Sequence, residues 1–282
     1  MDALWLEAAA MVALSAGLFA IGLRIARKAP KRDVAIVVLA AFGFLIGSAL
    51  LVREGFLLAR LLPLADLVVL GNWIPLGAGL LGGLAWRNIP GGAVRRSLTI
   101  VPLACIALYA AYGRLPGSPP ACGNAWRNGV CLQTTGSTCS AACAATVLKA
   151  HGIEATEAEM AALCLTRDSG TTPLGLFRGL KKKTAGTSWD VEAFSWTAMD
   201  LRRPETAPAI LDIRLSPKAL KDPRYIRDWG WTPGTFHTVV FFGFSPDGKI
   251  EMGDPSVGRE KWGEESLRTL WSGKGFRLVR RR

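Results

Sequence analysis

The chain has 282 residues, of which 50% are hydrophobic, and its mean hydropathy of +0.26 is high for a wholly soluble protein. The formal net charge is +12, and residues 1–120 hold 11 of the 34 basic and 5 of the 22 acidic residues, so each part of the chain carries half of the excess. Basic loops that flank membrane spans and attraction to anionic lipid explain this positive charge. We therefore do not expect nucleic acid as a partner.

Four long apolar runs in the first 113 residues predict a bundle of about four transmembrane helices. They cover residues 4–23, 34–52, 67–86 and about 97–113, and the first three hold 20, 19 and 20 residues. At about 1.5 Å per residue, helices of this length cross a hydrocarbon core of about 30 Å. Residues 55–65 are too short to span and are expected at a membrane interface.

The distribution of basic residues predicts the orientation of these spans. Five basic residues lie between positions 24 and 32, after the first run, and three arginines lie between positions 87 and 96, before the fourth. The positive-inside rule places both loops in the cytoplasm and both chain ends outside. Asp2 and Glu7 lie at the start of this segment and a basic flank follows it, whereas a cleavable signal has a basic start, so the first run is expected to be an anchor. We therefore expect an integral protein of the plasma or inner membrane with an extracytoplasmic C-terminal domain.

Residues 116–130 are rich in Pro and Gly and are expected to link the transmembrane region, residues 1–115, to a soluble domain, residues 131–282. Cys122 and Cys131 lie in and just after this linker. One hypothesis is that they form a disulfide, which requires an oxidising compartment, and the alternative is two unrelated free thiols.

The segment that begins at Cys139 predicts a helix, because it is rich in Ala and ends at Gly152. Cys139 stands in the first turn, where unpaired backbone N–H groups and the positive end of the helix dipole stabilise a thiolate. Cys143, one turn later, is expected to pack in the core. The two cysteines do not have the spacing or the histidine neighbours of a zinc site, so we expect neither a metal nor a cofactor.

A thiolate nucleophile needs a group that accepts and returns a proton, and imidazole suits this task at neutral pH. The chain has 2 histidines. His151 lies at the C-terminus of the predicted helix, where a histidine commonly caps carbonyl groups. His237 begins residues 236–244, a predicted central strand rich in β-branched and aromatic residues. His237 is therefore the candidate base.

Two further residues are expected near His237 and Cys139. The turn sequence of residues 245–248 predicts a hairpin, which returns the chain beside the strand of His237 and ends at Asp254. There the carboxylate of Asp254 orients the imidazole; the alternative is an Asp that only initiates a turn before Pro255. Gln133, six residues before Cys139, is expected to direct its amide at an oxyanion, and the alternative is an exposed loop residue.

The order of these residues resembles the C39 family of papain-like cysteine peptidases. The resemblance covers roughly residues 125–282 and lies in Leu132-Gln133, Cys139-Ser-Ala-Ala-Cys143, Pro208-Ala-Ile-Leu211, Phe236-His237-Thr238 and Asp254-Pro-Ser-Val-Gly258. In that family the Gln supplies the oxyanion hole, the Cys attacks the scissile carbonyl, the His acts as base and acid, and the Asp orients the His. The resemblance implies a membrane-anchored peptidase that processes a peptide or protein, such as a leader or exported peptide, in association with a separate export system.

The chain departs from the family pattern in three ways. The family usually has Asp-Cys-Gly around the nucleophile, whereas this chain has Thr138-Cys139-Ser140. The added side chain of Ser140 puts the double-glycine cleavage rule of the bacteriocin exporters in question. The sequence contains no Gly-x-x-x-x-Gly-Lys-Ser/Thr phosphate loop. In those exporters the peptidase precedes the membrane spans and faces the cytoplasm, whereas here it follows them.

The remaining pattern predicts helices at residues 157–165 and 173–180 and strands at residues 191–196, 209–214 and 276–280. Residues 225–231 are expected to form a loop beside His237. The expected fold is thus an N-terminal bundle of about four transmembrane helices followed by an α+β papain-like domain, in which the helix bearing Cys139 packs on an antiparallel sheet. Two other functions remain open: a non-catalytic, membrane-tethered peptide-binding module of the same fold, and an acyl transferase.

Overall fold

The computed structural model describes residues 3–53, 55–112, 117–215, 222–228 and 230–281. The chain divides into two compact units, one of residues 1–58 and 66–116 and the other of residues 59–65 and 117–282. The end of the fourth apolar run at residue 113, the start of the predicted linker at residue 116 and residue 229 of the predicted loop lie outside the described residues.

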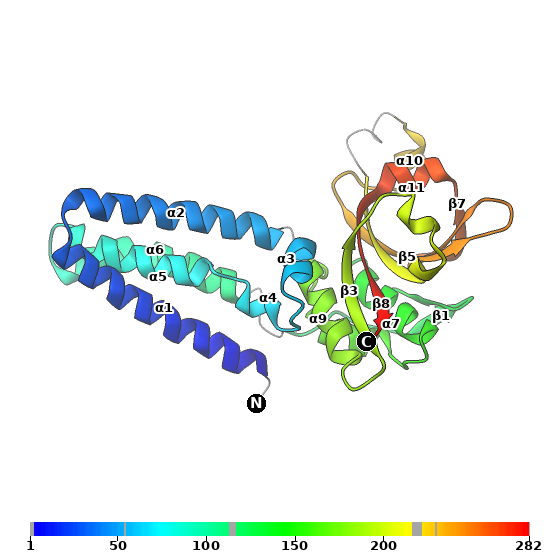
Figure 1. Cartoon of the computed structure of the whole chain (residues 1–282), viewed down its shortest axis with the longest axis horizontal. Coiled ribbons are helices and arrows are strands. Elements are labelled where there is room, and N and C mark those ends of the chain that lie inside the picture. The colour runs from blue at the N-terminus through cyan, green and yellow to red at the C-terminus, as the bar shows by residue number, and fades with distance from the viewer. Residues whose placement is uncertain (1–2, 54, 113–116, 216–221, 229, 282) are drawn as a thin grey trace. The chain divides into compact units, whose positions relative to one another are not determined.

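The first unit is helical, and its long helices run alongside one another (Figure 1). Within the described residues, four segments are long and apolar enough to cross a membrane: Leu4–Lys28, Lys31–Leu50, Val68–Asn88 and Ala93–Ala111. The helices are α1 (Ala3–Lys28), α2 (Lys31–Arg53), α3 (Gly55–Leu61), α4 (Leu67–Leu70), α5 (Ile74–Asn88) and α6 (Ala93–Tyr112).

The third apolar run, predicted as one continuous span, is broken between α4 and α5 at residues 71–73. Pro75 stands in the first turn of α5, where its missing N–H costs no hydrogen bond. A proline cannot donate to the carbonyl four residues earlier, so it stops a continuing helix but is tolerated at the start of a new one. Asn72, in the break, is buried, and its Nδ2 donates a 3.0 Å hydrogen bond to the carbonyl of Ala110 in α6.

Helices α1 and α5 approach until their backbones touch. A Cβ atom added at Gly79 would collide with the carbonyl oxygen of Ser15, and one at Gly83 would collide with that of Phe19. On the other helix, a Cβ at Gly22 would lie 2.5 Å from the carbonyl oxygen of Leu80. Glycines four residues apart are typical of close helix pairs in membranes, because they let dispersion forces act between the two backbones.

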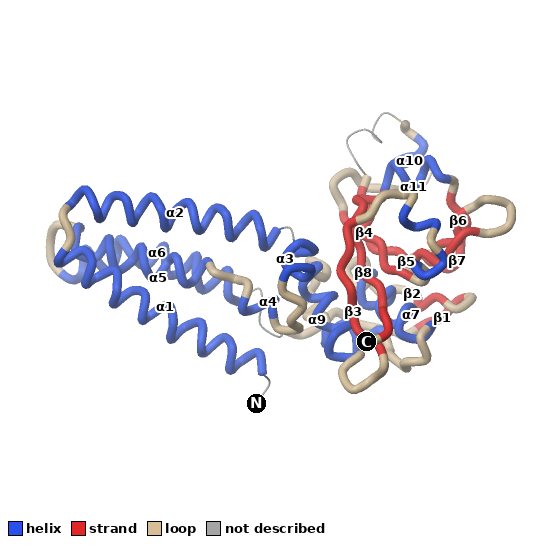
Figure 2. Tube along the Cα trace, in the orientation of Figure 1, coloured by secondary structure: helices blue, strands red, loops and turns tan. Residues whose placement is uncertain are grey.

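The second unit is built on a six-stranded antiparallel sheet in the order β3-β8-β4-β5-β6-β7 (Figure 2). Its strands are β3 (Trp189–Ser195), β4 (Ala209–Arg214), β5 (Phe236–Phe244), β6 (Ile250–Asp254), β7 (Gly258–Trp262) and β8 (Trp271–Arg280). A separate hairpin pairs β1 (Ala125–Arg127) with β2 (Val130–Leu132).

Helices and short turns cover the sheet of this unit. They are α7 (Cys139–Ala150), α8 (Glu157–Leu163), α9 (Pro173–Lys183), α10 (Arg224–Arg227) and α11 (Glu264–Leu270), with the 3-10 turns η1 (Asp200–Arg202) and η2 (Pro204–Thr206). Residues 139–148 of α7 are all buried, and the small side chains of its alanines let the helix lie close to β5. The nucleophile candidate therefore begins the central helix of the unit.

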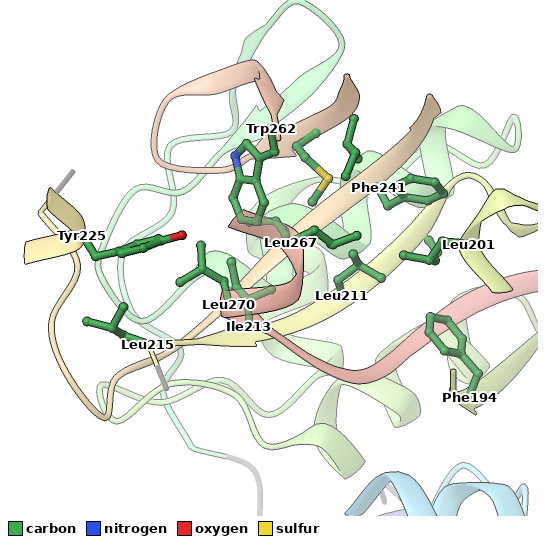
Figure 3. Close-up of a cluster of buried hydrophobic side chains, with 14 residues drawn as sticks. Phe194, Leu201, Leu211, Ile213, Leu215, Tyr225, Phe241, Trp262, Leu267 and Leu270 are labelled. Atoms are coloured by element: carbon green, nitrogen blue, oxygen red, sulfur yellow. The ribbon is translucent and has the colours of Figure 1, made fainter. Parts of the chain in front are cut away.

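A cluster of buried apolar side chains lies on the face of the sheet that α11 covers (Figure 3). Leu267 and Leu270 of α11 join Leu211, Ile213 and Phe241 in this cluster. Successive side chains of a strand point to opposite faces, so Thr238 and Val240 of β5 point away from Phe241. This two-sided burial explains the apolar, β-branched character of β5.

The architecture predicted from the sequence, apolar N-terminal helices followed by an α+β domain with the Cys139 helix on an antiparallel sheet, is confirmed. The strands predicted at residues 191–196, 209–214, 236–244 and 276–280 correspond to β3, β4, β5 and the second half of β8. Strands β1, β2 and β7 and helix α11 were not predicted. The three strands have three to five residues and α11 has seven, too few for a hydrophobic period to stand out in the sequence.

Candidate active site

Cys139 is the first residue of α7 and is 8% exposed. The preceding turn is closed by Thr138, whose hydroxyl accepts a 3.1 Å hydrogen bond from the N–H of Thr135 and donates one of 3.1 Å to its carbonyl. The Thr138 side chain therefore does not cap the first turn of α7. The first N–H groups of the helix are left to act on a negative charge beside Cys139.

His237 and Asp254 come together through the β5–β6 pairing. The register sets Val240 opposite Gly253, and beyond this pair the Nε2 of His237 lies 3.0 Å from the Oδ1 of Asp254. The same oxygen accepts a 2.7 Å hydrogen bond from the N–H of Ser256, which fixes the carboxylate. Because Nε2 is engaged with Asp254, Nδ1 is the ring nitrogen left for Cys139.

The electrostatics of this group favour a charged pair. Burial opposes the ionisation of Cys139, but its hydrogen bond with His237 and the imidazolium charge lower the pKa of the thiol below its usual value. Burial likewise disfavours a charged His237, yet its hydrogen bonds with Asp254 and Cys139 raise its pKa to about 10. The pKa of Asp254 is lowered, against the effect of burial, by its hydrogen bond with His237. Together these shifts favour a thiolate on Cys139 beside an imidazolium on His237.

Cys143 and Ser140 flank the nucleophile candidate on the buried side of α7. The Sγ of Cys143 donates to the carbonyl oxygen of Thr238 at 3.1 Å, and burial raises the pKa of this thiol well above its usual value. The packing role expected for Cys143 agrees with this environment. The hydroxyl of Ser140 lies 2.9 Å from that of Thr238, so its side chain points into the fold and not into solvent.

Gln133 lies between the turn before α7 and the turn after β6. Its backbone N–H donates to the carbonyl of Pro255 at 2.8 Å, its amide Nε2 donates to the carbonyl of Thr135 at 2.9 Å, and its Oε1 accepts from the hydroxyl of Ser256 at 3.3 Å. A primary amide has two N–H bonds, so one remains for a further acceptor. The side chain is thus held by both turns that flank the site.

Glu157, which was not predicted as a site residue, stabilises the loop that carries Gln133. It is fully buried, and its carboxylate accepts hydrogen bonds from the backbone N–H groups of Thr134 at 2.7 Å, Gly123 at 3.1 Å and Asn124 at 3.3 Å. The sequence Thr156-Glu-Ala-Glu159 is typical of a helix start and agrees with the helix predicted from residue 157, but it does not indicate the partners of Glu157. The carboxylate fixes the residue that follows Gln133.

The other cysteines and histidine named from the sequence have simpler environments. Cys122 and Cys131 are both free thiols, so the hypothesised disulfide is not formed in the structure. The hairpin register sets Cys131 opposite Trp126, whereas Cys122 precedes the hairpin. The two cysteines therefore give no support for an oxidising compartment. His151 caps α7, as expected, through a 2.8 Å contact between its Nδ1 and the carbonyl of Val147.

The predicted loop at residues 225–231 contains α10 in its first part, and its last residue reaches the site. The ring of Trp231 meets the ring of His237 edge to face, with centroids 5.9 Å apart. The neighbouring Phe236 is 62% exposed. Among the residues that the structure describes, no group of three or more His, Cys, Asp or Glu side chains is arranged to hold a metal ion.

Comparisons with known proteins relate part of this chain to one family of peptidases. Residues 127–216 match the model of the Peptidase C39 family. The peptidase domain of Streptococcus ComA, a bifunctional ABC transporter of a quorum-sensing pathway, is 23% identical, with 54% of this chain and 98% of that chain covered and a TM-score of 0.42. The peptidase domain of Streptococcus mutans ComA is 21% identical, with 54% and 98% covered and a TM-score of 0.37.

A third solved structure is a double glycine motif protease from an AMS/PCAT transporter in complex with the leader peptide. It is 18% identical, with 54% of this chain and 91% of that chain covered and a TM-score of 0.42. The comparison with curated proteins gives no match. The resemblance inferred from the sequence, a C39-like peptidase domain behind a set of apolar helices, is confirmed by the family match and by the four long apolar helices.

Proposed function

We propose that this protein is a membrane-anchored cysteine peptidase that hydrolyses a peptide with Cys139, His237, Asp254 and Gln133. One observation carries the proposal: His237 is held 3.0 Å from Asp254 by one ring nitrogen, while the other serves the sulfur at the start of α7. The match of residues 127–216 to the Peptidase C39 family supports a cysteine peptidase in general.

In the first half of the proposed reaction, the thiolate of Cys139 attacks the carbonyl carbon of the scissile peptide bond. A C–S bond forms, and the carbonyl electrons move to the oxygen. The backbone N–H of Cys139 and the remaining amide N–H of Gln133 donate hydrogen bonds to this oxyanion. When it collapses, the C–N bond breaks and His237 gives the proton on Nδ1 to the leaving amine, which leaves a thioester on Cys139.

In the second half, His237 is neutral at Nδ1 and accepts a proton from water, while the water oxygen bonds to the thioester carbon. The C–S bond then breaks, the acid product leaves, and the thiolate and imidazolium are restored. Asp254 keeps the Nε2–H of His237 directed at itself in both halves, which fixes the tautomer and stabilises the imidazolium. The elevated pKa of His237, about 10, suits the acid role, since the ring is protonated before the attack.

The substrate that we propose is a leader or exported peptide that is cleaved close to the membrane. Support comes from the chain's own apolar helices and from the leader peptide bound to the AMS/PCAT protease. The Ser140 side chain is buried against Thr238 and not directed into solvent, so we propose that a substrate with small residues before the scissile bond can approach Cys139. From the basic loops at residues 24–32 and 87–96 we propose that the domain is extracytoplasmic.

The test uses the full chain, purified in detergent, and its Cys139→Ala variant. Peptides secreted by cells that make each protein are compared by mass spectrometry, and cleavage of the accumulating precursor is then measured in vitro. We expect cleavage by the parent protein and none by the variant, with water as the acceptor even when an amine is added. Identical peptide sets from both cell types would reject proteolysis, and aminolysis products would indicate an acyl transferase.

A further inference from the structure

Two buried hydroxyl groups belong to the residues that directly follow Cys139 and His237 in the chain, and the proposed mechanism does not use them. Ser140 is the next residue of α7 and is 5% exposed, and Thr238 follows His237 in β5 and is 8% exposed. Their oxygens lie 2.9 Å apart, and either can be the donor. Hydrogen bonding by both side chains favours the thiolate and contributes to the lowered pKa of Cys139.

The hydrogen-bond capacity of these three groups does not allow every contact at once. Each hydroxyl has one proton, so the pair has two protons for two kinds of acceptor, the thiolate and the other hydroxyl. If one hydroxyl donates to its neighbour, only the neighbour's proton is free for the sulfur. The two hydroxyls together can therefore donate one hydrogen bond to the thiolate while they remain bonded to each other, and either residue can be its donor.

The charged and titratable groups around this pair come from three elements besides α7. His237 on β5 and Asp254 on β6 form the ion pair already described. Glu260 on β7 interacts electrostatically with both of them. Burial raises the pKa of Glu260, and its hydrogen bond with Trp262 acts in the opposite direction. On α7 itself, Cys143 is neutral because burial raises the pKa of its thiol.

We propose that Ser140 and Thr238 form a shared donor that stabilises the Cys139 thiolate, in addition to its pairing with His237. A hydrogen bond to an ionised sulfur is stronger than one between neutral groups, and burial keeps water from taking its place. The two residues are positioning residues for the nucleophile. This inference rests on the proposed function, because it takes Cys139 to be the reacting group.

Redundancy is the property that separates this role from simple packing. Removal of one hydroxyl frees the other to donate to sulfur, so each single variant keeps one donor. Removal of both leaves the thiolate with His237 and the first N–H groups of α7 alone. The pKa of Cys139 is therefore expected to change little in Ser140→Ala or Thr238→Val and to rise by about one pH unit in the double variant.

The experiment measures the rate of alkylation of Cys139 by iodoacetamide against pH in the full-length protein. Fragment-ion mass spectrometry separates Cys139 from the other cysteines, and Cys139→Ala gives the background. Below the titration midpoint we expect less than about a threefold slowing in each single variant and about a tenfold slowing in the double variant. Thr238→Ser combined with Ser140→Ala keeps one hydroxyl and should titrate like the parent.

Two results overturn the proposal: a double variant that titrates like the parent, or a single variant with the full effect of the double. If Ser140→Ala with Thr238→Val does not fold, Ser140→Gly with Thr238→Val removes the same hydroxyls and is measured instead. Alkylation needs no substrate, so its outcome is separate from the proposed peptidase activity. A stabilised thiolate without hydrolysis leaves this inference standing and rejects the proposed function.

Discussion

The two ends of α7 differ in chemistry. Cys139 stands at the N-terminal end and His151 at the C-terminal end, and each contacts a different kind of group. At the N-terminal end, Cys139 meets an imidazole whose far nitrogen is bound to the buried carboxylate of Asp254. At the C-terminal end, His151 binds only a backbone carbonyl and rests edge to face on Trp189, with ring centroids 4.4 Å apart. A carboxylate partner and an electropositive helix end make a reactive group, whereas a carbonyl partner and an aromatic neighbour make a cap.

The largest effect is expected when the two cysteines of α7 are replaced one at a time. Cys139→Ala should abolish peptide hydrolysis and labelling by a thiol-directed peptide electrophile, because no other thiol of α7 is ionised. Cys143→Ala removes a neutral thiol bonded to the carbonyl of Thr238 and should retain labelling. Labelling is followed by intact-protein mass. Equal labelling of both variants would remove Cys139 from the nucleophile's role.

Replacing the two histidines tests the two ends directly. His237→Gln should lower kcat/KM by at least about 10³-fold, because the variant has neither the base nor the imidazolium that lowers the pKa of Cys139. His151→Gln loses only a cap and should keep activity within about twofold, with a stability loss of about 1 kcal/mol. Steady-state kinetics and thermal unfolding of both proteins check this. Comparable losses of activity at the two positions would contradict the assignment.

Asp254→Asn sharpens the contrast by leaving the histidine in place while taking away its charged partner. The pKa of His237, about 10 in the parent, should fall because the hydrogen bond and the charge of the carboxylate both raise it. The activity that needs an imidazolium is present below this pKa and lost above it, so the alkaline limb of the pH–rate profile should move to lower pH. We expect about a 10²-fold fall in kcat/KM at neutral pH. An alkaline limb at the same pH in both proteins would show that Asp254 does not raise the pKa of His237.

A smaller effect is expected at Glu157, which supports the N-terminal end through Thr134. Burial opposes its ionisation, but the hydrogen bonds from Thr134 and Asn124 lower its pKa below 4.5, the value of the free side chain. Its stabilisation is therefore complete above that value and is lost as pH falls through the lowered pKa. Glu157→Gln should unfold about 2 kcal/mol more easily at pH 7, and the difference should shrink in acid. Thermal unfolding of both proteins from pH 7 to pH 3 measures this difference in stability. A difference that stays constant with pH would contradict a stabilising role for the ionised Glu157 carboxylate.

The sequence reasoning succeeded where spacing alone determines the neighbours. A tight turn at residues 245–248 returns the chain beside β5, so the proximity of Asp254 and His237 followed from hairpin geometry. A run of alanines before Gly152 likewise defined α7 and its first residue. Both inferences needed only contacts close in the chain.

It failed where a contact joins distant segments or where one residue interrupts a pattern. Glu157 binds residues 123, 124 and 134, and nothing in its own surroundings names these partners. The contact of Ser140 with Thr238 spans 98 positions in the chain. The break before α5 depends on Pro75 and the buried Asn72, which an average over an apolar run hides.

The backbone contact between α1 and α5 has a mechanical consequence. Side chains normally act as spacers that let two helices slide by changing rotamers, and at Gly22, Gly79 and Gly83 no such spacers exist. Translation of one helix along the other would drive carbonyl oxygens into the neighbouring Cα atoms. We therefore expect α1 and α5 to move together as one rigid pair.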